Sequence, residues 1–136
     1  MMDLSNLMAD VSGSVMTLRH PATDEVITDE KGNPMTITLV GTDSDQYRKE
    51  VKRRFSELQR NKGRKVQAVD LDDAEQKAVE LLSCCTVDCH LVFDKKPVSL
   101  ADIGKIYAEP KLRWLREQAE AFVADRANFI NSSKAS

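Results

Sequence analysis

Residues 83 to 97 read SCCTVDCHLVFDKKP, and in this stretch a helical pattern gives way to a strand. The apolar spacing before it predicts a helix that ends near Cys85, whereas His90-Leu91-Val92-Phe93 predicts a short strand. Asp94 to Pro97 has the residue types of a turn. The stretch therefore places one short β element between helices.

All three cysteines of the chain lie in the same stretch, next to His90, which raises the question of a metal site. Structural zinc takes about four nitrogen or sulfur ligands, usually in spaced pairs. Cys84 and Cys85 are adjacent, as are Cys89 and His90, and adjacent side chains diverge on both helices and strands. There is also no C-x-x-C redox pair. We expect no metal and no cofactor, with Cys85 and Cys89 as small packing residues.

A length of 136 residues predicts one domain, residues 1–136, able to bury a core without disulfides or metals. The net charge of -2 provides no global attraction to nucleic acids or acidic membranes. No apolar run approaches the ~20 residues of a membrane span, and the first residues lack the basic region of a signal peptide. Three cysteines, two of them adjacent, make a poor disulfide framework, so we expect the chain to stay in a reducing cytoplasm.

The N-terminal part is strand-like. Residues 1–13 are weakly patterned and are expected to be a flexible lead-in. Residues 15–40 predict a small antiparallel β meander with strands at 15–20, 25–28 and 35–40, separated by turn residues.

The rest of the chain, residues 43–131, is mainly helical in its pattern, and 132–136 form a polar tail. Four helices are expected: one from an Asp43–Gln46 capping box to Asn61-Lys62-Gly63, one from Leu71 to Cys85, one from Leu100 to before Pro110, and one from Lys111 to about Asn131. The first carries an apolar stripe that we assign to packing: Tyr47, Val51, Phe55 and Leu58. The second has an inward face of Ala74, Ala78, Leu81, Leu82 and Cys85. The fold class is α+β.

Catalytic signatures are missing from the sequence. His20 and His90 are the only histidines, and no G-x-S-x-G, P-loop or H-E-x-x-H pattern occurs. The carboxylates lie at helix starts and in turns, where capping explains them. We therefore expect a protein that is not an enzyme.

A basic run occupies residues 48–65, with nine basic and two acidic residues, whereas residues 70–80 hold five acidic residues and one basic. A helix with Arg48, Lys52 and Arg53 on its surface could follow phosphates. The same charges also fit a solvated helix face whose charge is compensated by the acidic helix that follows. We favour this second interpretation, because the protein as a whole is acidic. A basic surface for an acidic protein partner lies between these alternatives.

The terminal helix carries more apolar residues than one helix face needs. These residues are Trp114, Leu115, Phe122, Phe129 and Ile130. We expect the excess to serve recognition of a partner or self-association.

A set of motifs spread over the chain resembles one protein family. In the C-terminal half the motif residues are Leu81, Leu82 and Cys85 to Val87; Phe93, Asp94, Lys96 and Pro97; Ser99; Ile106 and Tyr107; Trp114 to Gln118; and Ala124 to Phe129. In the N-terminal half they are Leu18 to Pro21, Gly41 to Ser44, Tyr47 and Arg48. The chain resembles the tail assembly chaperones of phages with long, non-contractile tails. Asp88-Cys89-His90 departs from that pattern, in which an aromatic residue and a glycine follow Cys-Thr-Val.

The resemblance implies a mechanical role. Such chaperones bind the long, apolar, helical tape-measure protein and tail-tube subunits in the host cytoplasm, and they are not in the mature virion. Some occur in a longer, frameshifted form. A long apolar helix needs repeated shielding, so a homo-oligomer is expected, without membrane or nucleic acid. Two alternatives stay open: a small nucleic-acid-binding phage regulator that uses residues 48–65, and a minor tail structural or connector protein.

Overall fold

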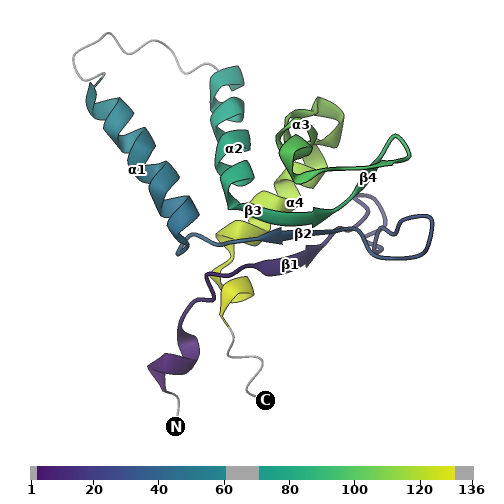
Figure 1. Ribbon diagram of the computed structural model, residues 1–136, viewed down its shortest axis with the longest axis horizontal. Helices are drawn as coiled ribbons and strands as arrows, with labels where there is room; N and C mark the ends of the chain where they lie inside the picture. Colours follow the sequence, from purple (N-terminus) through teal and green to yellow (C-terminus); the bar gives the residue numbers. More distant parts are fainter. Residues whose placement is uncertain (1–2, 61–70, 131–136) are drawn as a thin grey trace.

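The computed structural model describes residues 3–60 and 71–130. A three-stranded antiparallel sheet in the order β1-β2-β3 occupies the middle of the molecule, and α1 and α2 rise from one side of it (Figure 1). The strands are β1 (Ser14–Thr17), β2 (Thr36–Leu39), β3 (Thr86–His90), β4 (Val92–Phe93) and β5 (Lys96–Pro97). The α-helices are α1 (Asp45–Arg60), α2 (Leu71–Cys85), α3 (Ile103–Ala108) and α4 (Arg113–Ala124). Short 3-10 helices are η1 (Leu4–Leu7), η2 (Leu100–Asp102), η3 (Pro110–Leu112) and η4 (Arg126–Phe129).

These elements confirm the α+β fold class, with an N-terminal antiparallel sheet, four α-helices and β structure between helices. The expected end of the first helix at Asn61-Lys62-Gly63, the tail at 132–136 and the side chain of Leu58 lie outside the described part of the chain. Within that part, no helix has both the length and the apolar character needed to cross a bilayer.

The third strand of the sheet comes from a distant part of the chain. Ile37 on β2 is opposite Met16 on β1 and Cys89 on β3. The predicted strand at 25–28 is reduced to two isolated bridges, Arg19 with Val26 and Thr28 with Pro34. The predicted strand at 90–93 starts too late, because the β-branched Thr86 already pairs with Leu39 of β2 directly after α2.

The core lies where β2 meets α2, α3 and α4. Its fully buried side chains are Leu18, Ile37, Leu39, Val40, Cys85 and Tyr107. Cys85 is 0% exposed, which confirms the prediction that it is a packing residue. On the predicted inward face of α2, Leu82 is also buried, whereas Ala74 is exposed.

The start of α1 differs from the expected capping box. The backbone N–H of Tyr47 donates to Ser44 Oγ at 3.2 Å, and Ser44 Oγ donates to the Gly41 carbonyl at 2.7 Å. Asp43 instead accepts two hydrogen bonds from Arg126, at 2.8 and 3.0 Å. The prediction of Asp43 as the cap is wrong because its carboxylate ties the start of α1 to the end of the described chain.

The terminal helix is shorter than predicted. It ends at Ala124, because Asp125 adopts an extended backbone and its side chain accepts from the N–H of Ala127 at 3.1 Å. This local hydrogen bond starts η4 instead of a further α-helical turn. Asn128 then donates to the Phe122 carbonyl at 3.0 Å, which folds the segment back onto α4.

The segment that folds back onto α4 buries Phe129, which is 3% exposed. Its ring lies edge-on to Phe122, with centroids 5.4 Å apart. A Cβ added at the buried Gly41 would come within 2.7 Å of the Phe129 ring. Glycine is therefore required at position 41 by the close approach of this ring.

Replacing this glycine provides a test of the packing. Gly41→Ala is expected to destabilise the protein by about 1–3 kcal/mol, because the added methyl forces Phe129 out of its site. Gly104→Ala on α3 is the matched control, since its Cβ meets only Ser83 Oγ at an ordinary 3.4 Å and alanine favours the helix. Urea denaturation of both variants measures the difference. Equal stability of the two variants would contradict this packing.

Candidate functional site

An apolar cavity of about 200 Å³ lies between the β4–β5 hairpin, the start of α4 and the long connection from β1 to β2. This connection, residues 18–35, is called the 18–35 excursion below. Its floor consists of buried residues: Leu18, Leu91, Ile106 and Leu115. Its rim is half-buried and includes Ile27, Met35, Val92, Val98, Leu112 and Trp114, together with Phe93, which is 46% exposed. The partial exposure of the rim shows that the cavity opens to the surface.

The hairpin places Phe93 at this rim. Val92 is opposite Pro97 and Phe93 is opposite Lys96, and the N–H of Val98 donates to the Leu91 carbonyl at 2.9 Å. The two turn residues, Asp94 and Lys95, both have positive φ, 53° and 64°, as a tight two-residue hairpin requires. The turn chemistry read from the sequence therefore positions an aromatic side chain over the cavity.

The opposite wall is held by one glutamine of α4. Gln118 accepts from the N–H of Arg19 at 3.1 Å and donates to the Arg19 carbonyl at 2.7 Å. This pair of hydrogen bonds fixes the beginning of the 18–35 excursion against α4. Because Leu18, Ile27 and Met35 come from that excursion, Gln118 also fixes the shape of the cavity.

The size and lining of the cavity define what it can accept. A dry apolar cavity of ~150 Å³ binds benzene in a model protein. A cavity of about 200 Å³ with an open, half-exposed rim is large enough for one bulky apolar side chain of another polypeptide. The contact would gain free energy from burial of apolar surface.

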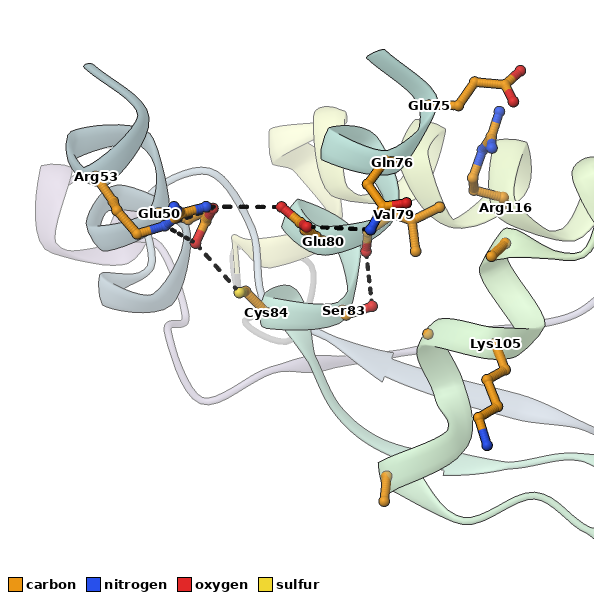
Figure 2. A pocket seen from close by; sticks show the side chains of 13 residues that line it. Glu50, Arg53, Glu75, Gln76, Val79, Glu80, Ser83, Cys84, Lys105 and Arg116 are labelled. Atoms are coloured by element: carbon orange, nitrogen blue, oxygen red, sulfur yellow. Dashed lines mark hydrogen bonds and ion pairs between the residues drawn. The ribbon is translucent and has the colours of Figure 1, made fainter. Parts of the chain in front are cut away.

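A second, larger hollow of about 750 Å³ lies between α1, α2 and α3, and its lining mixes charged side chains such as Glu50 and Lys105 with apolar ones such as Val79 (Figure 2). Glu50 on α1 accepts hydrogen bonds from Arg53 and Arg54, and Arg53 also pairs with Glu57. Arg54 reaches across to the backbone carbonyl of Lys77 on α2. The contact of Arg54 with Lys77 and the ion pair of Arg53 with Glu80 at 3.8 Å thus attach α1 to α2.

Two titratable side chains of this hollow, Glu50 and Cys84, have pKa values shifted by their surroundings. The hydrogen bond from Arg53 holds the pKa of Glu50 below its usual value, so Glu50 stays ionised. Burial, together with the nearby Glu50, raises the pKa of Cys84, whose thiol lies 3.7 Å from the carboxylate. A protonated thiol is a poor nucleophile. The Cys84 thiol therefore stays protonated beside an ionised carboxylate.

The cysteines and His90 occupy separate surroundings. Cys85 is buried in the core, Cys84 faces Glu50, and Cys89 lies 3.7 Å from the Val98 carbonyl. His90 pairs with Asp29 at 2.9 Å. Among the described residues, no group of three or more His, Cys, Asp or Glu side chains is arranged to hold a metal ion.

The residues predicted on the terminal helix are largely covered by the chain itself. Leu115 is 5% exposed and Phe129 3%, so the expectation of an exposed surplus is wrong for both. Phe122 and Ile130 are half-buried, the former against Phe129 and the latter bridged to Ala9. Trp114 alone of this set lies half-buried at the rim of the apolar cavity.

The basic residues predicted on α1 divide into two kinds. Arg48 and Lys52 are exposed, whereas Arg53 is engaged by Glu50 and Glu57. The apolar stripe that we assigned to packing is also divided: Tyr47 packs against the core, but Val51 is 42% and Phe55 62% exposed. The prediction that the stripe is internal is wrong for these two residues, because the polar side chains of α1 face α2.

The sequence did not single out the cavity itself. Ile27 and Met35 come from a loop with little regular structure, and Phe93 was read as the end of a strand and as a motif residue of the resemblance, not as part of a binding site. The one available signal was Phe93 directly before a turn, where an aromatic side chain is commonly exposed. Comparison with protein-family models, curated proteins and solved structures finds no match for this chain.

The Glu50 contact predicts a pH-dependent stability. Because the folded-state pKa of Glu50 is lowered, its ionised form stabilises the fold above its normal pKa, and this contribution is lost as pH falls. At about pH 7, Glu50→Gln is expected to cost about 1–2 kcal/mol, since a charge-assisted hydrogen bond is lost. Urea denaturation should show a smaller difference from the parent protein at about pH 3. A difference that does not change with pH would contradict the role of the charge.

The cysteines predict an order of thiol reactivity. Burial raises the pKa of Cys85 to about 11, so this thiol should react with a disulfide reagent only after unfolding. Cys84 is exposed but should react more slowly than a free thiol, because its own pKa is raised. Cys84→Ser provides the control by removing that signal. Native labelling of Cys85 at the rate of Cys84 would contradict the burial.

Proposed function

We propose that this chain is a non-enzymatic phage tail assembly chaperone that binds the tape-measure protein and tail-tube subunits. It acts as an oligomer in the host cytoplasm and is not in the mature virion. The observation that carries the proposal is the open apolar cavity with Trp114 and Phe93 at its rim, since an open apolar cavity suits a polypeptide partner. The sequence resemblance to such chaperones supports the same partner.

The cavity matches the chemistry expected of a tape-measure helix. A long apolar helix presents a row of bulky side chains, and a cavity of about 200 Å³ accepts one of them per chaperone molecule. Burying one such side chain contributes about 1.5–3 kcal/mol, which is too little for a stable complex. Many copies along one helix add their contributions, so weak single contacts and an oligomer belong together.

The charges of α1 favour a protein partner over nucleic acid. Arg53 and Arg54 are both engaged by Glu50, which leaves Arg48, Lys49 and Lys52 as exposed cations of the described part of α1. Residues 61–65 of the basic run lie outside the described residues. Phosphate binding draws on several unpaired cations on one face, so neutralisation of two arginines weakens that alternative.

Co-expression with the tape-measure protein encoded downstream tests the proposal. The parent chain should keep that protein soluble, and Phe93→Glu should reduce the soluble yield severalfold, because a carboxylate at the rim opposes apolar contacts. Val15→Glu on β1 is the matched control, since Val15 is 61% exposed and does not line the cavity. If the tape-measure protein is equally insoluble with and without the parent chain, the proposal fails.

Intrinsic fluorescence gives a second readout. Trp114 is the only tryptophan of the chain and lines the cavity, so its emission should shift to shorter wavelength when a tape-measure peptide enters. The shift should be absent in Phe93→Glu and retained in Val15→Glu. Recovery of this chain from purified virions would instead favour a tail structural or connector protein.

A further inference from the structure

Helix α1 carries an apolar stripe that its own chain leaves open. Phe55 is 62% exposed and Val51, one turn earlier, is 42% exposed. Tyr47, a further turn back, packs against the core and anchors the stripe at the sheet. An amphipathic helix normally turns such a stripe inward, so this one is available to a partner.

Unpaired positive charge borders the stripe. Arg48 and Lys52 lie on the side of the stripe away from Glu50 and Arg54, because successive residues turn by about 100°. Within the described part of the chain, neither has a carboxylate partner, whereas Arg53 and Arg54 are held by Glu50. The surface thus combines two apolar side chains with two free cations.

The N-terminal segment, residues 3–11, has the complementary character. Leu4 is 81%, Met8 69% and Val11 55% exposed. Asp3 and Asp10 are on the same segment and act as local caps, accepting from the N–H groups of Ser5 and Ser12. The hydrogen bonds from Ser5 lower the pKa of Asp3, so this carboxylate stays ionised and the segment is apolar and acidic.

The two surfaces lie on opposite sides of the molecule. The N-terminal segment is attached to the body where Ala9 bridges Ile130 and the N–H of Asp10 donates to the Phe129 carbonyl. From there it extends away from the sheet on one side, while α1 extends on the other (Figure 1). The segment therefore does not reach α1 of its own chain, and contact between these surfaces requires a second molecule.

We propose that the N-terminal segment of one copy docks on α1 of a second copy, with Leu4 and Met8 over Val51 and Phe55. The carboxylate of Asp3 then approaches Arg48 and Lys52. An α1–α1 contact is disfavoured, because each α1 carries six basic and three acidic residues and the charges would repel.

Such a contact is heterologous, since it joins two different surfaces. Because these surfaces point in opposite directions, repeated contacts add copies in a row and do not close a pair. This assignment rests on the oligomer of the proposed function, to which a row of copies along a tape-measure helix is well suited. Its test needs no tape-measure protein, so the two can fail separately.

Sedimentation velocity of the full chain over a range of concentrations tests the contact. Phe55→Glu disrupts the apolar stripe of α1, and Met8→Glu disrupts the N-terminal segment that docks on it. Each variant alone should be monomeric where the parent protein forms larger species, with association weakened at least about tenfold. An equal mixture should form heterodimers and nothing larger, because each pair retains only one intact contact. Val26→Glu, at a residue 41% exposed on the 18–35 excursion, should associate like the parent protein.

Charge reversal checks the electrostatic part. Arg48→Glu and Asp3→Lys should each weaken association, and an equal mixture of Arg48→Glu with Asp3→Lys should recover it in part. If Phe55→Glu or Met8→Glu lowers the melting temperature, the two charge variants test the contact in their place. A parent protein that stays monomeric, variants that associate normally, or a mixture that remains monomeric would each overturn the proposal. Soluble tape-measure protein in co-expression with Phe55→Glu would then show that chaperone function does not need the contact.

Discussion

The junction between α2 and β3 is the constraint on which the rest of the structure depends. The helix ends at Cys85 and the strand begins at Thr86, with no residue between them. The buried Thr86 hydroxyl donates to the Leu82 carbonyl at 2.9 Å and lies 2.8 Å from the hydroxyl of Tyr107. The Cys85 carbonyl accepts from the N–H of Val40 at 2.8 Å. One buried point therefore joins α2, α3 and the central strand, and burial makes these polar contacts costly to break.

The apolar cavity follows from this junction. Once β3 pairs with β2, the chain must continue past Leu91 into the β4–β5 hairpin, which carries Phe93 to the rim. Tyr107 fixes α3, and α3 supplies Ile106 to the floor. The cavity is therefore formed by four segments that are distant in sequence but held to one buried centre. Such a site can accept a side chain without a large rearrangement of the backbone.

Local patterns predicted the fold class, the extent of α2 and the burial of Cys85, because each follows from spacing within a few residues. They failed where a long-range contact decided the outcome. Asp43 accepts hydrogen bonds from Arg126 and does not cap α1. Asp125 ends α4 because it caps the following 3-10 turn. The cavity could not be predicted, since its rim combines Met35, Phe93 and Trp114 through tertiary packing alone. Periodicity also identified the stripe on α1, but it does not distinguish an internal face from a face left for a partner.

The way in which α1 is attached explains why its stripe is open. Glu50, Arg53 and Arg54 turn toward α2, where the ion pair of Arg53 with Glu80 and the hydrogen bond from Arg54 to the Lys77 carbonyl hold the helix. Exposed ion pairs contribute little stability, about 0–1 kcal/mol each, whereas burying Phe55 would contribute more. The observed orientation gives up that burial, and an apolar surface retained at a cost in stability is best explained by contact with another polypeptide.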